Sequence, residues 1–76
     1  MKYVWVVLRE KYPHYKDSFE ISVEKVFGTK EAADRYVNGK YKDLAEADLS
    51  ENYILYEIDS HDETTYISIR KVDIEY

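Results

Sequence analysis

Residues 18–36 read SFEISVEKVFGTKEAADRY, and the spacing of their apolar side chains changes at Gly28-Thr29. Before that point, Phe19, Ile21 and Val23 alternate with polar residues, which is the period of a half-buried strand. After it, the apolar residues are three and four positions apart, as on one side of a helix. The centre of the predicted fold is therefore a strand that leads directly into a helix.

The predicted helix runs from about Lys30 to Asn38. Thr29 can cap the free amide groups of its first turn, and Gly39 offers the left-handed conformation that commonly ends a helix. We expect a looser or short helical piece around residues 42–47. A kinked continuation through Gly39 stays open as the alternative, because a glycine inside a helix costs only about 1 kcal/mol.

Working outward, residues 2–8 are apolar on both alternating faces and indicate a central strand. Residues 9–17 contain the only proline and are expected to form the first loop. Residues 53–59 and 64–76 predict a second hairpin around a polar turn. The alternation slips at Glu24-Lys25 and again near Arg70-Lys71, which predicts a β-bulge at each place.

The expected fold class is α+β, with the order ββαββ: a four-stranded antiparallel sheet with one helix packed on one face, in a single domain spanning residues 1–76. The last strand is expected at an edge of the sheet, where unpaired amides make a homodimer through an edge strand plausible. The predicted core consists of Trp5, Val7, Ile21, Val23, Ala33, Val37, Ile54, Ile58, Ile67 and Ile69.

The composition excludes several classes of site. Without cysteine, the chain has no disulfide framework, no thiolate zinc site and no cysteine nucleophile. Its longest apolar run, residues 3–8, is far shorter than the roughly 20 residues of a membrane-spanning helix. No small-residue cleavage site follows that run, so we expect no signal peptide. We therefore expect a cytoplasmic protein without membrane contact.

The charge of the chain is unevenly distributed. Residues 1–42 carry nine basic and six acidic side chains, a net of +3, whereas residues 43–76 carry two basic and ten acidic ones, a net of −8. An acidic half disfavours contact with nucleic-acid phosphates and favours a basic partner surface. The alternative is that the charge serves only solubility.

No set of residues predicts catalysis, a cofactor or a metal ion. Residues 60–63, SHDE, contain a histidine beside two carboxylates, but adjacent side chains in a turn diverge, whereas metal ligands and catalytic triads converge. Gly28 precedes a helix as in phosphate-binding loops, yet the further glycines and the lysine of such a loop are missing. We therefore expect a non-enzymatic binding protein.

Nine tyrosines in 76 residues are more than so small a core can enclose, and tyrosine suits an interface. Combined with the acidic half, they predict a partner-binding rim of carboxylates around a tyrosine anchor. Its predicted residues are Glu46, Asp48, Glu51, Tyr53, Tyr56, Glu57, Asp59, Asp62, Glu63 and Tyr66.

The alternative function is a module that binds a nucleotide or single-stranded nucleic acid. The loop from Arg9 to Lys16 combines basic side chains with Tyr12 and Tyr15, and aromatic residues on the sheet face could add stacking. Glu10 and Asp17 dilute the positive charge of this loop.

Residues 26–36, VFGTKEAADRY, follow a strand and precede the acidic strand YILYEID at residues 53–59. This pattern, which covers about half of the chain, resembles small phage and mobile-element proteins of ββαββ order. Acidic single-domain members of that group resemble anti-CRISPR and other host-defence inhibitors, which present carboxylates where phosphates would bind. The resemblance implies a stoichiometric inhibitor or adaptor acting in the host cytoplasm on a basic, nucleic-acid-binding protein surface, and it implies no catalytic residue.

Overall fold

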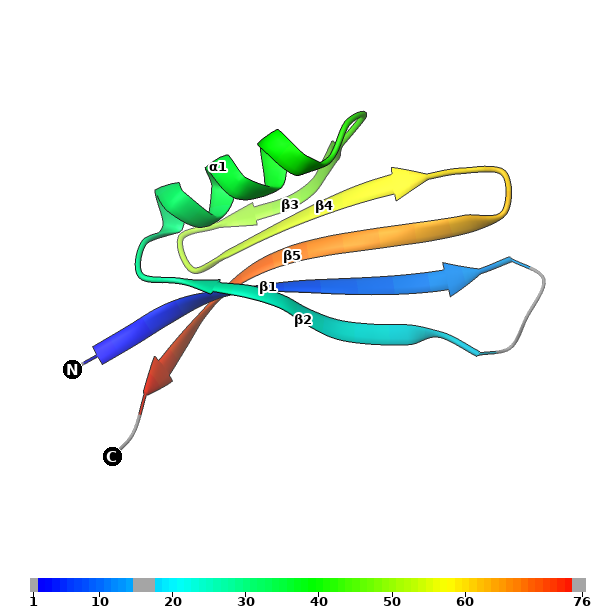
Figure 1. The fold of residues 1–76 in the computed structure, drawn as a ribbon. Coiled ribbons are helices and arrows are strands. Elements are labelled where there is room, and N and C mark those ends of the chain that lie inside the picture. Colours follow the sequence, from blue (N-terminus) through cyan, green and yellow to red (C-terminus); the bar gives the residue numbers. More distant parts are fainter. Residues whose placement is uncertain (1, 15–17, 75–76) are drawn as a thin grey trace.

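The computed structural model describes residues 2–14 and 18–74 and shows one helix lying across a twisted antiparallel sheet (Figure 1). Each strand pairs antiparallel with its neighbours, in the spatial order β2-β1-β5-β4-β3. The elements are β1 (Lys2–Pro13), β2 (Glu20–Phe27), α1 (Lys30–Lys40), β3 (Ala45–Ser50), β4 (Tyr53–Asp59) and β5 (Glu63–Ile74).

The sheet has five strands, so the predicted four-stranded ββαββ order is wrong. The additional strand is β3, in the region where a short helical piece was expected. Its sequence, AEADLS, contains good helix formers. β3 pairs with β4 from Ala45, opposite Glu57, to Ser50, opposite Tyr53. This pairing satisfies backbone groups of β4 that would otherwise be free, and it outweighs the helix propensity of the six residues.

The last strand lies at the centre of the sheet and not at an edge as predicted. β5 pairs with β1 along its whole length, from Ile74 opposite Lys2 to Glu63 opposite Pro13, and with β4 on its other side. A homodimer through the edge of β5 is therefore excluded. The edges of the sheet are β2 and β3.

β1 is longer than predicted, because residues 9–13 continue the strand between β2 and β5 instead of forming a loop. Pro13 ends the strand beyond Lys11, the last β1 residue that pairs with β2, and so occupies an edge position, which a proline tolerates. Residues 15–17 of the expected loop lie outside the described residues.

Helix α1 begins where predicted. The Thr29 side chain accepts a hydrogen bond of 3.1 Å from the Ala32 amide, as an N-cap does. The helix continues through Gly39 to Lys40, two residues past the predicted end, and the Tyr41 amide donates to the Val37 carbonyl at 3.0 Å. Gly39 has no positive φ angle, so it does not act as the helix terminator that the sequence suggested.

The core lies between α1 and the sheet. Seven of the ten predicted core residues are buried there, but Ile58 is only half-buried, and Ile21 and Val23 are 56% and 62% exposed. Ile21 and Val23 pair with Glu10 and Leu8, which point away from the helix because Val7 points toward it. The buried hydrophobic side chains are Trp5, Val7, Ala33, Val37, Ile54, Tyr56, Ile67 and Ile69.

Of the two predicted bulges, one is confirmed. The β1–β2 register shifts opposite residues 23–25, so Glu24 is the extra residue of β2. Between β1 and β5 the register is continuous, so the bulge predicted near Arg70-Lys71 is wrong. The parity of the apolar residues changes there because Val72 and Ile74 lie on the sheet face opposite to Ile67 and Ile69.

Candidate interaction surfaces

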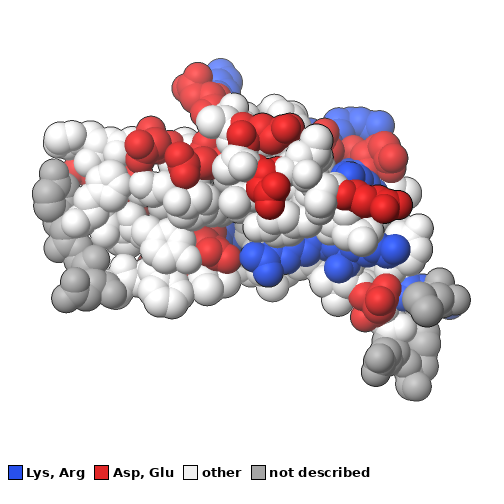
Figure 2. Space-filling model, turned by 180° about the vertical axis from the view of Figure 1, so that it is seen from behind, with Lys and Arg blue, Asp and Glu red and all other residues white. Residues whose placement is uncertain are grey.

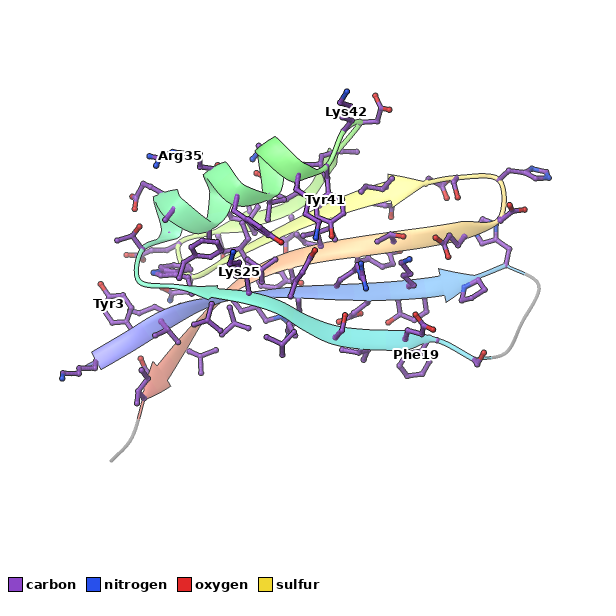
Figure 3. All side chains as sticks on the ribbon, viewed as in Figure 1. Tyr3, Phe19, Lys25, Arg35, Tyr41 and Lys42 are labelled. Atoms are coloured by element: carbon purple, nitrogen blue, oxygen red, sulfur yellow. The ribbon has the colours of Figure 1, made fainter. Side chains whose placement is uncertain are left out.

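The two faces of the sheet differ in what covers them. We call the side packed against α1 the helix face and the other side the open face. Figure 3 shows Lys25 and Tyr41 on the side of the helix and Phe19 pointing away from it. No described element covers the open face (Figure 1).

The acidic edge, which we define as Glu46, Asp48 and Glu51, lies on and just after the edge strand β3. All residues of this strand are exposed. Asp48 accepts a hydrogen bond of 2.9 Å from the Leu49 amide. Among the described residues, none of the three carboxylates forms a salt bridge, so their charges face solvent uncompensated.

Two further predicted carboxylates, Glu57 and Asp59, lie on the open face of β4 and are engaged within the protein. A hydrogen bond with Glu57 raises the pKa of the Tyr66 hydroxyl. Asp59 accepts a hydrogen bond of 2.9 Å from Thr64 and lies 3.9 Å from Nε2 of His14. The two carboxylates therefore lie on the strand next to β3.

The last two predicted carboxylates, Asp62 and Glu63, lie where the chain passes from β4 to β5. Asp62 is exposed in the β4–β5 turn, and its carbonyl accepts a hydrogen bond of 2.9 Å from the His14 amide. Glu63 pairs with Lys11 at 3.9 Å on the helix face. The seven predicted carboxylates are therefore divided among two faces and two turns and do not form one rim.

The three predicted anchor tyrosines lie in different environments. Tyr56 is 9% exposed, and its hydroxyl donates a hydrogen bond of 2.6 Å to Asp34 in α1, so it belongs to the core. Tyr53 is half-buried, with the Arg70 guanidinium 5.2 Å from the centre of its ring. Tyr66 is half-buried on the open face.

In contrast to the acidic edge, many cations are engaged within the protein. Lys30 donates to the carbonyls of Ser50 and Glu51 at 3.2 Å each, and Lys40 binds the Glu24 carboxylate. Seen from behind, the molecule carries acidic side chains across its upper part and a basic band below them, with a mostly uncharged region at lower left (Figure 2). Further cations lie over aromatic rings: Lys25 over Tyr36, Arg70 over Tyr53 and Lys71 over Tyr3.

The basic aromatic loop of the alternative function is divided by the fold. Arg9 and Lys11 share the helix face with Val7, whereas Tyr12 lies on the open face. The ring of Tyr12 stacks on that of Phe19, with 5.5 Å between the ring centres, and meets the ring of Tyr66 edge-on, with 5.6 Å between the centres. Its hydroxyl donates to Glu10 at 2.7 Å, and this hydrogen bond raises the pKa of Tyr12.

Reasoning from the sequence missed a surface of exposed apolar side chains on the open face. We call these residues the apolar strip. Its members come from the chain just before β2, from β2 itself and from the end of β5. The sequence did show that Phe19, Ile21 and Val23 share one face and that residues 2–8 are apolar on both faces, but it did not show which face the helix leaves open. The strip consists of Phe19, Ile21, Val23, Val26, Val72 and Ile74, each between 36% and 62% exposed.

A cavity of about 210 Å³ lies at the start of α1, between Tyr3, Trp5 and residues 28–31. Lys30 partly closes it, since its ammonium group lies 5.7 Å from the centre of the Trp5 ring. In the described part of the chain, no group of three or more histidine or acidic side chains converges as metal ligands would. Residues 2–14 and 18–74 also include no helix long and apolar enough to cross a membrane.

Comparison of the chain with models of known protein families, with curated proteins and with solved structures finds no match.

Proposed function

We propose that this protein is a non-enzymatic binding domain, a stoichiometric inhibitor or adaptor that holds a partner protein by a basic, nucleic-acid-binding surface. The observation that carries the proposal is the acidic edge. Its three carboxylates are exposed and have no salt-bridge partner among the described residues, although the chain contains eleven lysines and arginines.

The acidic edge should act mainly on the rate of association. Exposed charges of one sign attract a partner of the other sign over distances near the Debye length, and this raises the rate of association. Glu57 and Asp59 on the adjacent strand add to the same field. Tyr53, next to β3 and half-buried, supplies a ring that a partner can cover once it has docked.

The alternative, a module for single-stranded nucleic acid, is favoured by the cluster of Tyr12, Phe19 and Tyr66, whose rings could stack on bases. The carboxylates of Glu10 and Glu57 contact two of these rings and would repel the phosphates of a bound strand. A protein partner is therefore the better fit.

The test compares two double variants that carry the same net charge of −3. Glu46→Gln with Asp48→Asn neutralises the acidic edge, whereas Glu20→Gln with Asp73→Asn neutralises exposed carboxylates on β2 and β5. In affinity purification from the native host, a basic protein should be recovered with the wild type and the β2–β5 variant, and should be lost with the acidic-edge variant.

The kinetics of the recovered complex give a second measurement. Neutralising the acidic edge should slow association at low salt and flatten its salt dependence, whereas Tyr53→Ala should mainly speed dissociation. Equal recovery of the partner by both double variants would remove the proposal. Binding of a fluorescent single-stranded oligonucleotide that is lost in Tyr12→Ala would favour the alternative.

A further inference from the structure

We propose that the apolar strip is a homodimer interface, on which a second copy of the chain docks face to face to form a two-layered β-sandwich. This inference goes beyond the proposed function and does not rest on it, because the acidic edge and the apolar strip are different surfaces.

The two faces of the sheet differ in polarity beyond the end of α1. Beyond the helix, the helix face carries polar side chains, including Arg9, Ser22 and Glu20, as expected for a surface in contact with water. On the opposite side of the same strands lie Leu8, Ile21 and Val23. The exposed apolar residues of β2 therefore lie on the side away from the helix, which fits an open face that is covered in the functional assembly.

Two of the charged side chains beside the strip form an ion pair. The ionised side chains of β1 and β5 on the open face are Lys2, Glu10 and Arg70, and Glu10 and Arg70 lie 3.8 Å apart. Arg70 also lies over the ring of Tyr53. The strip can therefore approach a second copy although the whole chain carries a net charge of −5.

The open face is large enough for a dimer interface. The molecule measures 43 × 25 × 19 Å, and the sheet spans the two longer dimensions. A face of this size has room for the roughly 800 Å² per partner that a standard interface buries. Val4, Val6 and Leu8, half-buried on the open face of β1, continue the apolar surface between β2 and β5.

The edges of the sheet are poor alternatives for self-association. β2 has a bulge at Glu24, and β3 has a register shift beside Glu46 and Asp48. Bulges and charged residues on edge strands hinder pairing with another strand. Two copies of β3 would in addition bring the carboxylates of the acidic edge together.

Charge also selects the orientation of the second copy. With the two-fold axis parallel to the strands and over the strip, the two acidic edges project in opposite directions. With the axis perpendicular to the strands, the acidic strands β3 and β4 of both copies would face each other and repel. With this axis over β1, in the middle of the strip, β2 of each copy faces β5 of the other. The two copies of each β2 residue then lie at the same height and about 14 Å apart, because the packed sheets are separated by about 10 Å and the two β2 strands by about two strand spacings.

Sedimentation equilibrium of the wild type at micromolar concentrations tests the proposal, with Val23→Lys and Ser22→Lys as a matched pair. The two positions are adjacent, exposed, and on opposite faces of β2. The wild type and Ser22→Lys should reach twice the chain mass of 9.1 kDa, and Val23→Lys should stay at 9.1 kDa. Circular dichroism should show the same fold for all three. A wild type that remains a monomer, or dissociation caused equally by both variants, would overturn the proposal.

Cross-linking gives an independent test that tolerates a poorly folding lysine variant. Since the chain has no cysteine, Val23→Cys and Ser22→Cys each introduce a unique thiol. A bismaleimide that spans about 14 Å should link Val23→Cys into a dimer and leave Ser22→Cys unlinked. Linkage of Ser22→Cys alone would indicate pairing through the β2 edge and refute the face-to-face arrangement. The acidic-edge variant should dimerise as the wild type does, so the two proposals can fail separately.

Discussion

The Tyr56 hydroxyl donates a hydrogen bond of 2.6 Å to Asp34 Oδ1, and this bond joins β4 to α1 over the core. Asn38, one turn further along the helix, donates to the same carboxylate oxygen at 3.0 Å. Burial, and then the hydrogen bond with Asp34, raise the pKa of Tyr56. The ring fills the core while its polar end is satisfied, so Tyr56 serves the fold.

Tyr56→Phe tests this role. It removes the hydroxyl and keeps the ring, so it should lower the free energy of unfolding by about 1.5 to 3 kcal/mol, the range for a hydrogen bond to a charged group. Urea unfolding measures the loss. Tyr53→Phe is the control, because the structure shows no hydrogen bond of its hydroxyl to another described residue. Equal losses in both variants would contradict the assignment of Tyr56 to the core.

A second prediction concerns the centre of the sheet. Ile69 is fully buried, whereas Leu49 on β3 is 57% exposed. Ile69→Ala and Leu49→Ala each remove three carbon atoms, but only the first leaves a cavity. The loss of unfolding free energy should be about 2 to 5 kcal/mol for Ile69→Ala and well under 1 kcal/mol for Leu49→Ala. Thermal or urea unfolding checks the order.

A third prediction uses Gly39, which lies inside α1 with an ordinary helical backbone and open space where a side chain would begin. Gly39→Ala should therefore stabilise the protein by about 0.5 to 1 kcal/mol, mainly by restricting the unfolded chain. A higher unfolding midpoint would support the continuation of the helix to Lys40. Destabilisation would mean that the helix ends before Gly39 in solution.

Local features of this fold could be predicted because short-range chemistry decides them. The side chain of Thr29 caps a helix whatever lies beyond it, and Glu24 interrupts an alternation that is visible in the sequence. The strand at Tyr53–Asp59 has the predicted bounds for the same reason, since β-branched and aromatic residues alternate there up to a polar turn.

The side of the sheet that the helix covers could not be predicted from period alone. An alternation of two shows that Ile21 and Val23 share a face, but it does not show whether that face is the one beneath α1. The apolar residues of β5 change from one face to the other between Ile69 and Val72, and the period does not show this either. Both faces carry apolar residues, so a change of covered face resembled a bulge in the sequence.

The acidic edge was predicted only in part. Glu46, Asp48 and Glu51 were identified from their charge, but the strand that carries two of them was expected to be helical. β3 forms because β4 provides an edge for it, which is a tertiary interaction that helix propensity does not report. For the same reason, Tyr56 was assigned to the surface although its neighbours in space bury it.

The last prediction concerns Glu24, the extra residue of the bulge, whose carboxylate is directed to the end of α1. Its side chain is 10% exposed and accepts hydrogen bonds from the hydroxyls of Tyr41, at 2.6 Å, and Tyr36, at 3.3 Å, and from Lys40. Burial alone would raise the pKa of Glu24, but the hydrogen bonds from Lys40 and Tyr41 outweigh it and hold this pKa below its ordinary value of 4.5.

Of these partners, Tyr41 should matter more for stability than Lys40. The Lys40 side chain is 45% exposed, so water and salt screen its interaction with Glu24. Tyr41 is half-buried and approaches both oxygens of the Glu24 carboxylate. Tyr41→Phe should therefore cost about 1.5 to 3 kcal/mol of unfolding free energy, whereas Lys40→Met should cost clearly less, and less still at high salt.

The pH dependence of stability follows from the lowered pKa of Glu24. A carboxylate whose folded pKa lies below its unfolded pKa contributes stability that is fully present above the unfolded value and is lost as the pH falls through the folded one. Between about pH 5 and about pH 3, the wild type should therefore lose more unfolding free energy than Glu24→Gln does. Glu20→Gln, an exposed change on the same strand, should follow the wild type. If the unfolding free energies of wild type and Glu24→Gln run parallel across this range, the Glu24 carboxylate does not stabilise the junction between β2 and α1.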